Sequence, residues 1–270
     1  MDLPSYWQKP LASDFKNLLW NLPERKTKRI LNLGGNQQNF ATVIKNSEFL
    51  ATNFPFETVT TLLPDALKAQ LPPLPNLLFA PSTESGSFAP SNTTAAPLTS
   101  LASAVASSDI TLLSGDFSKN SATAIALTQT LRNHPEHTFI LTRDSIDLLN
   151  ASAAEFINSP HLIMIASLSQ LQKLFRALYY PKMILLSMPL LPVIEILHKF
   201  TLSYPCLILT FHDENIILAK DGQVFTVPIS NTHYSPLSLW SGQLACRVAA
   251  LSLWNPQNQL GAATAALFEG

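Results

Sequence analysis

The stretch DITLLSGDFSKNSATAIALTQTLRNHPEHTFILTRDSIDLLN, residues Asp109–Asn150, decides the fold class of this chain. A short continuous apolar run, Asp109–Ser114, leads into a segment whose apolar residues have helical spacing. A second apolar run, TFIL, is followed by another short helical segment, RDSIDLLN. Apolar strands that alternate with amphipathic helices are typical of a parallel sheet covered on both faces, so these residues predict an α/β protein.

The same alternation extends in both directions along the chain. Arg29–Leu33 reads as a buried strand followed by a helix, and HLIMIA is followed by the helical pattern SLSQLQKLFRAL. After Tyr204 the apolar runs CLILT, ENIILA and QVFTVP are separated only by FHD and KDG, which predicts a hairpin meander. Two helices, around Gly242–Trp254 and Gln259–Phe268, close the chain. We expect a three-layer α/β/α domain with a mostly parallel sheet, an antiparallel meander at one edge, and Arg29–Leu33 and Asp109–Ser114 as interior strands.

The composition indicates a compact globular chain with no charged footprint. Of 270 residues, 47% are hydrophobic and 13% are charged, and the net charge is −1. This excludes the basic surface expected of a nucleic-acid or anionic-membrane binder. Cys206 and Cys246 lie in apolar stretches and read as buried thiols, which fits a cytoplasmic location. The apolar span Met183–Leu197 is interrupted by two prolines and Glu195, so it is expected to be core and not a membrane span.

Ala80–Ser108 is rich in Ser, Thr, Ala and Pro and carries one charge, Glu84. It reads either as a surface loop or as a mobile lid over a ligand crevice.

Four stretches carry a resemblance to a known family. They are NLGGN (Asn32–Asn36), LLSGDFSKNSATAIAL (Leu112–Leu127), FILTRDSIDLLN (Phe139–Asn150) and LSLWSGQLACRVAAL (Leu237–Leu251). In order, they resemble the G-G-S turn, the G-P-G-L-G-R loop, the D-A-D-A-L-N-L-L segment and the G-T-G-D-V-L-A-G loop of the ribokinase-like superfamily. Within it the chain is most similar to the ADP- or ATP-dependent NAD(P)H-hydrate dehydratases. The resemblance implies a single ribokinase-like domain over residues 25–270, with residues 1–24 as an N-terminal extension that packs on it.

The chain departs from the family pattern at the positions of the family's catalytic and phosphate-binding residues. By spacing, Gln243 stands where the family has the Asp of G-T-G-D, its proton carrier. In the T-P-H-P-G-E segment Ser167 takes the place of the His and Gln170 that of the Glu. Thr210 stands in place of the phosphate-binding lysine of K-G-x-x-T, and Glu214 in place of its threonine. A glutamine amide keeps hydrogen bonding but cannot carry a proton near neutral pH, so acid–base catalysis is expected to be lost.

The resemblance also implies which residues would face ligands. It implies nucleotide contacts at Ser241, Gly242, Gln243, Thr210 and Glu214, with ADP or ATP as the bound nucleotide. It implies substrate contacts at Gly34, Gly35, Asn36, Thr42, Gly115, Asp116, Ser118 and Ser167. From the residues themselves, Asp116 and Lys119 in SGDFSKN read either as part of a helix start or as an anion site.

Three functions stay open on these observations. The first is a nucleotide- or dinucleotide-binding module with weak or no dehydratase activity, and Gly34, Gly35 and Gly242 favour this function and the next one equally. The second is an active NAD(P)H-hydrate dehydratase or small-molecule kinase that uses other groups. The third is a structural or interaction protein whose crevice is filled by side chains such as Phe211 and Trp240.

The histidines and the remaining aromatic residues are not interpreted as ligand contacts. His134, Glu136 and His137 in NHPEH read as solvated turn residues, and no metal site is predicted. The aromatic residues outside the motifs read as packing or interface residues; they are Trp7, Trp20, Tyr179, Tyr180 and Tyr234. The partners expected are a small-molecule nucleotide or dinucleotide and further copies of the chain in a homo-oligomer.

Overall fold

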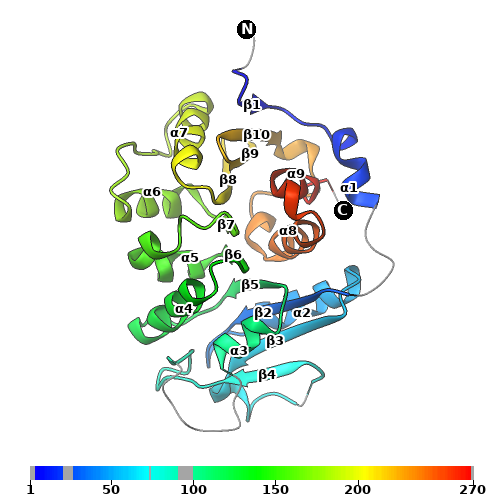
Figure 1. Ribbon diagram of the computed structural model, residues 1–270, viewed down its shortest axis with the longest axis vertical. Helices are drawn as coiled ribbons and strands as arrows, with labels where there is room; N and C mark the ends of the chain where they lie inside the picture. Colours follow the sequence, from blue (N-terminus) through cyan, green and yellow to red (C-terminus); the bar gives the residue numbers. More distant parts are fainter. Residues whose placement is uncertain (1–3, 21–26, 73, 91–99, 269–270) are drawn as a thin grey trace.

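A ten-stranded sheet runs through the centre of the molecule (Figure 1). The computed structural model describes residues 4–20, 27–72, 74–90 and 100–268. The strand order is β1-β10-β9-β8-β7-β6-β5-β2-β3-β4. The strands are β1 (Trp7–Gln8), β2 (Arg29–Gly34), β3 (Thr58–Pro64), β4 (Leu77–Ala80), β5 (Ile110–Gly115), β6 (Thr138–Thr142), β7 (Leu162–Ile165), β8 (Leu207–His212), β9 (Asn215–Lys220) and β10 (Gln223–Pro228).

The pairing confirms the predicted α/β fold class. From β4 to β8 every neighbouring pair is parallel, whereas β8, β9 and β10 form an antiparallel meander. Both strands expected in the interior, β2 and β5, lie next to each other inside the sheet. The turn between β8 and β9 places Asp213 and Glu214 at positive φ, as a tight hairpin of this hand requires.

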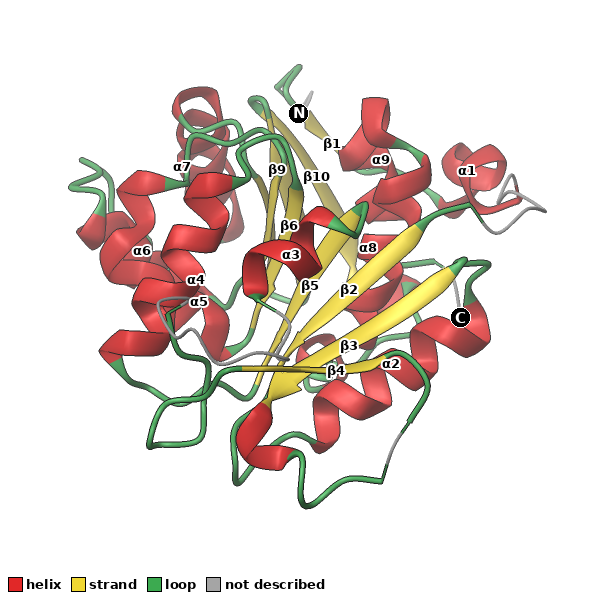
Figure 2. Cartoon of the chain, turned by 60° about the horizontal axis from the view of Figure 1, so that its bottom comes forward, coloured by secondary structure: helices red, strands yellow, loops and turns green. Residues whose placement is uncertain are grey.

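Helices cover both faces of the sheet (Figure 2). Buried residues of α3 to α7 pack on one face, and those of α2, α8 and α9 on the other. Successive strand residues alternate between these layers, with Leu113 in the first and Leu112 in the second. The helices are α1 (Lys16–Trp20), α2 (Ala41–Asn53), α3 (Leu101–Ala106), α4 (Ser121–Asn133), α5 (Asp144–Leu149), α6 (Leu168–Ala177), α7 (Leu190–Ser203), α8 (Gln243–Trp254) and α9 (Gln259–Ala265).

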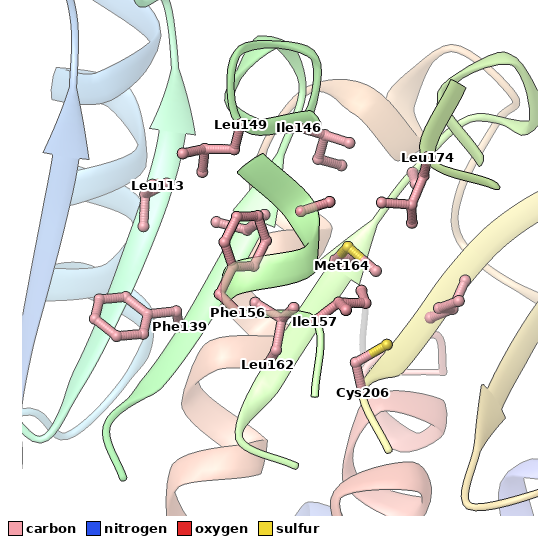
Figure 3. Close-up of a cluster of buried hydrophobic side chains, with 14 of the residues drawn as sticks. Leu113, Phe139, Ile146, Leu149, Phe156, Ile157, Leu162, Met164, Leu174 and Cys206 are labelled. Atoms are coloured by element: carbon pink, nitrogen blue, oxygen red, sulfur yellow. The ribbon is translucent and has the colours of Figure 1, made fainter. Parts of the chain in front are cut away.

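The larger buried cluster lies between the sheet and the α4–α7 layer. Figure 3 shows part of it, where Leu113, Phe139 and Met164 from three strands meet Ile146 and Leu174 from helices. Cys206 lies in this cluster and Cys246 in the opposite one, and both thiols are free and buried, as the sequence predicts. Burial raises the pKa of both thiols.

The N-terminal residues take part in the sheet. β1 pairs in parallel with β10, and the indole Nε1 of Trp7 donates to Oγ1 of Thr226 at 2.8 Å. The expected end of the N-terminal extension at residue 24 lies outside the described residues, as do residues 91–99 of the expected loop or lid.

The expectation that Met183–Leu197 is core is wrong for its first half. Met183, Leu185 and Leu186 are exposed, and burial becomes regular only inside α7, at Val193, Ile194 and Leu197. The segment before α7 is not helical, and Pro189 disfavours a helical backbone at the residue before it, so the apolar side chains of this segment have no periodic face to turn inward. No helix in the described part of the chain is long and apolar enough to cross a bilayer.

Candidate functional site

Two adjoining hollows open where the carboxyl ends of the parallel strands meet, and together we call them the crevice. Their volumes are about 370 and 300 Å³, and Arg143 and Trp240 line both. The first is otherwise lined by Thr42, Lys45, Asn46, Ser241 and Gln243, and the second by Asp147, Ser167, Ser169 and Gln170. In open α/β sheets ligands bind outside the carboxyl ends of the strands, so the crevice is the candidate site.

The start of α8 forms one wall of the first hollow. Gly242 precedes the helix with φ +98°, and a Cβ atom there would lie 2.4 Å from Nδ2 of Asn46. Only glycine fits both constraints without movement. The first intrahelical bond runs from the N–H of Cys246 to the carbonyl of Gly242, so the N–H groups before it have no acceptor within the helix. This open helix end carries a partial positive charge beside the exposed Gln243.

A buried polar network supports this wall. Nδ2 of Asn46 donates to Oγ of Ser114 at 3.0 Å, and Ser114 in turn donates to Oδ1 of Asn32. Nδ2 of Asn32 also donates to Oγ of Ser47 at 2.8 Å. Since Asn32 and Ser114 lie on neighbouring strands and Asn46 on α2, the network holds α2 and the contact with Gly242 in one arrangement.

The loops after β5 and β6 bring a cation and carboxylates together. Nη2 of Arg143 lies 2.8 Å from Oδ1 of Asp116, and the N–H of Asp116 donates to Oδ1 of Asp144 at 2.8 Å. Asn36 donates to the carbonyl of Asp116 at 2.6 Å. Burial raises the pKa of Asp144, and the charge of Arg143 opposes that rise. Gly115, at φ +92°, leaves no room for a Cβ, which would lie 2.4 Å from Asp144 Oδ1.

Arg143 and Asp116 both have left-handed backbone, with φ of +57° and +60°. Such a conformation costs a non-glycine residue about 1–3 kcal/mol. One guanidinium nitrogen of Arg143, Nη1, is buried without a hydrogen-bond partner among the described residues. The ion pair with Asp116 holds this cation at the junction of the two hollows.

In the second hollow the residues at the positions of the family's His and Glu build the start of α6. Oγ of Ser167 accepts the N–H of Gln170, and Oε1 of Gln170 accepts the N–H of Ser167 at 3.0 Å, a reciprocal cap. Nε2 of Gln170 donates to the carbonyl of Arg143 at 2.6 Å and to Oδ2 of Asp147 at 2.8 Å. Burial alone would raise the pKa of Asp147, but hydrogen bonds from Lys173 and Gln170 lower it overall. Every polar atom of the Gln170 amide is therefore engaged in structure.

Of the residues expected at a site, most lie at or beside the crevice. Thr42, Ser167, Gln170, Ser241 and Gln243 line it, and Asn36, Gly115 and Asp116 lie next to Arg143. Gly34 and Gly35 contact the backbone of Gly115, to whose carbonyl the N–H of Gly35 donates at 3.0 Å.

Three of the expected contacts lie elsewhere. Thr210 is fully buried in β8 and its hydroxyl has no partner among the described residues, so it has no surface to offer a nucleotide. Glu214 is an exposed turn residue between β8 and β9. The N–H of Ser118 lies 3.3 Å from Oγ of Ser87, away from the hollows. Both faces of β8 are covered, with Ile208 in one buried cluster and Leu209 in the other, so Thr210 is enclosed on either face, which a motif match by spacing does not register.

Six crevice residues were not singled out from the sequence as ligand contacts: Lys45, Asn46, Arg143, Asp147, Ser169 and, apart from its role as a filler, Trp240. Arg143 carried a usable signal, since it is the first residue after β6 and polar residues at strand ends gather at this edge. Asn46 carried none, because nothing local distinguishes a buried amide from an exposed one on a helix. Within the described ranges, no group of three or more His, Cys, Asp or Glu side chains could hold a metal ion.

No protein-family model and no curated protein matches the chain. Several solved structures do match the chain. A ribokinase-like superfamily protein from Enterococcus faecalis superposes with a TM-score of 0.69 at 12% identity, covering 99% of this chain and 87% of the other. A protein of Streptococcus mutans gives 0.64 at 13% identity, covering 97% and 88%.

A third structure carries a named activity. It is the ADP/ATP-dependent NAD(P)H-hydrate dehydratase from Bacillus subtilis, crystallised with ATP and Mg²⁺ and soaked with CoA. Its TM-score is 0.54 at 12% identity, with 92% of this chain and 84% of that chain covered. Together with the strand order and the antiparallel edge, these likenesses show that the chain has the ribokinase-like fold.

Proposed function

We propose that the crevice binds the phosphate groups of an adenine nucleotide or dinucleotide and does not dehydrate a hydrated nicotinamide. The observation that carries the proposal is the lining of the first hollow. Lys45, Arg143 and the open end of α8 face it, and no carboxylate among the described residues lines it. Helix N-termini and basic side chains together favour bound phosphate.

The rest of the crevice suits the other parts of such a ligand. The hollows, at about 370 and 300 Å³, each lie near the lower end of the roughly 300–1,000 Å³ typical of ligand pockets. Trp240 lines both without closing either, and its indole offers an apolar face on which a base can stack.

We propose the absence of turnover because the expected acids are replaced by amides and the nearby carboxylates are engaged in other contacts. Gln243 offers an amide at the mouth of α8, and Gln170 is committed to the cap of α6. Asp116 is paired with Arg143, and Asp147 with Lys173 and Gln170. Asp144 has a raised pKa but accepts the N–H of Asp116 and lines neither hollow. No described carboxylate is placed to exchange a proton with a ligand at Gln243.

Isothermal titration calorimetry with ADP, ATP and NADPH tests the binding. We expect weak binding that weakens further with salt, because the contacts are charged and Lys45 and the start of α8 are exposed to solvent. Lys45→Gln should weaken it about threefold to tenfold. Lys199→Gln is the matched control, an exposed helical lysine on α7 outside the crevice, and should leave it unchanged. If millimolar ligand gives no heat, or both lysine variants weaken binding equally, the crevice is not a phosphate site.

A second variant separates binding from folding. Gln243→Glu places a carboxylate in the first turn of α8, where it should stabilise the helix by about 0.3–1 kcal/mol. The same charge should repel phosphate and remove the binding heat. For turnover, wild-type protein with ATP and hydrated NADH should show no measurable dehydration. Robust activity that survives Gln243→Ala would contradict this part of the proposal.

A further inference from the structure

Exposed apolar side chains gather on the connection between α6 and α7 and on the first turn of α7, beyond the C-terminus of the helix whose N-terminus lines the crevice. Of the ten large hydrophobic residues that are exposed in the described part of the chain, five lie here: Tyr179 (93% exposed), Met183 (59%), Leu185 (43%), Leu186 (67%) and Leu191 (44%). We call them the 179–191 surface. The connection extends outward at the left edge of Figure 1. Such a concentration of apolar side chains marks an interaction site on a soluble domain.

The 179–191 surface has a fixed shape. Ile184 is fully buried beneath it, and its carbonyl accepts a hydrogen bond from Nε2 of Gln172. The N–H of Met188 donates to the carbonyl of Leu185 at 3.1 Å, and the Met188 carbonyl lies 2.6 Å from Nε2 of His212 on β8. The exposed side chains are thus presented by an anchored segment, which lowers the entropic cost of binding.

Tyr179 occupies a backbone position that normally favours glycine. It follows the C-terminus of α6 with φ +52°. The N–H of Tyr180 donates to the carbonyl of Phe175 at 2.8 Å and that of Tyr179 to Arg176 at 3.1 Å, the two bonds of a Schellman motif. A bulky side chain at this position is strained, and one that is 93% exposed makes few contacts to offset the strain. A strained, outward-facing tyrosine points to a role in binding.

A hollow of about 220 Å³ adjoins Tyr179 and is large enough for one apolar side chain. Its floor and walls include the buried Phe175 and Ile184 and the ring of Tyr180, which packs 5.0 Å from Phe175. Arg176 and Lys182 also line it, and neither forms an ion pair with a described residue. The site therefore combines an apolar socket with two available cations.

The charge of the 179–191 surface distinguishes among a second copy of the chain, a lipid surface and a partner protein as its binding partner. The described residues that line the hollow include the two cations Arg176 and Lys182 and no carboxylate. A second copy seated two-fold on this surface would bring four lining cations together with no carboxylate between them, which is unfavourable. A lipid surface would match the charge but has no side chain to fill a socket of this size.

We propose that the 179–191 surface docks a segment of a partner protein that inserts one apolar side chain into the socket and sets carboxylates against Arg176 and Lys182. Tyr179 packs along the inserted side chain, as interface tyrosines do. The proposal is independent of the crevice and of any nucleotide.

Peptide display on the whole chain tests it. A library of random 12-residue peptides is selected on wild-type protein and counter-selected on Tyr179→Gly, and enriched peptides are then measured by fluorescence anisotropy. We expect peptides that pair Asp or Glu with a Leu, Phe or Trp. Tyr179→Gly should weaken them at least about tenfold, and Arg176→Gln with Lys182→Gln about threefold to tenfold. Lys199→Gln is the control and should have no effect.

Thermal unfolding guards against a trivial loss of fold. Because glycine suits φ +52°, Tyr179→Gly should keep the wild-type Tm or raise it by up to about 3 °C while losing the peptide. The proposal is overturned if no peptide survives counter-selection or if the survivors are basic. It is equally overturned if wild-type protein dimerises in a Tyr179-dependent manner, or if it pellets with vesicles of phosphatidylserine and phosphatidylcholine and binds no peptide.

Discussion

At the residue scale, His137 shows how burial turns an unremarkable turn residue into a pH-sensitive one. Its Nε2 lies 2.8 Å from Oγ1 of Thr111, and its ring packs 4.9 Å from that of Phe139. Burial lowers the pKa of His137 to about 4, and the neighbouring His134 adds to the effect. The sequence placed His137 in a solvated turn, but the fold draws its ring into contact with β5 and β6.

The sign of the pH effect follows from this depressed pKa. In the unfolded chain His137 binds a proton near pH 6.5, whereas in the folded chain it does so only near pH 4. Between these values the unfolded state holds more protons, so stability is full above about pH 6.5 and falls as the pH drops toward 4. We expect the group to contribute roughly 1–3 kcal/mol of this loss, since its ring is only partly buried. Urea unfolding at pH 7.0 and 4.5 measures it, and in His137→Gln the difference between the two pH values should shrink by that amount. An unchanged difference would assign the acid sensitivity to other groups.

At the element scale, the start of α6 explains why an amide stands where the resemblance places an acid. The Gln170 amide accepts a hydrogen bond in the cap with Ser167. It also donates hydrogen bonds to the Arg143 carbonyl and to the Asp147 carboxylate. A carboxylate at this position could accept but not donate, and it would face two oxygens. The amide therefore ties α6 to the β6 loop and to α5.

Gln170→Glu is the corresponding test. We expect it to destabilise the fold by about 1–3 kcal/mol at pH 7, because a buried acceptor loses its donor and a second carboxylate meets Asp147. Lowering the pH should reduce the loss, since a protonated carboxyl can donate again. Gln257→Glu, at an exposed position, is the control and should stay within about 0.5 kcal/mol of wild type. Guanidinium unfolding gives both numbers, and equal values for the two variants would remove Gln170 from the structural role assigned to it.

At the scale of the whole molecule, the N-terminal residues complete the sheet. β1 covers the outer edge of β10, Trp7 bonds Thr226, and the ring of Tyr6 stacks 3.8 Å from that of His198 on α7. An unpaired β10 would be an open edge strand, which is prone to pair with other chains. We propose that residues 25–270 fold as one domain and that residues 1–24 pack on it as an extension.

Removal of residues 1–24 tests this division. The shortened chain should keep its far-ultraviolet circular dichroism but lose about 2–4 kcal/mol, which lowers Tm by roughly 5–10 °C, and it should self-associate through β10. Trp7→Phe, which removes the bond to Thr226 and keeps an aromatic ring, should cost only about 1 kcal/mol. A shortened chain that does not fold would make residues 1–24 part of the domain, and one with unchanged Tm and size would show that they do not pack on it.

The local pattern of the sequence determined the class of the fold. Strands such as β2 and β5 are short apolar runs that end in glycine, and the helices between them have their own spacing, so both are encoded within a few neighbouring residues. The meander was predictable for the same reason, because two- to three-residue polar turns leave apolar runs no alternative to a hairpin. The part of the candidate site at the strand ends was also predictable, since the carboxyl ends of parallel strands must meet.

Only the tertiary structure decided which of those residues contact one another and which are buried. Arg143 pairs with Asp116 across two elements, and Asn46 reaches Gly242 from the other end of the chain, because helices pack on the sheet in an order that no local signal states. Thr210 is buried and Leu185 is exposed, against expectation, since the burial of a side chain depends on what lies opposite it. Local propensity selects strands and helices, whereas the partner of each side chain is set by the packing of distant segments, and the chemistry of the crevice belongs to that second kind of information.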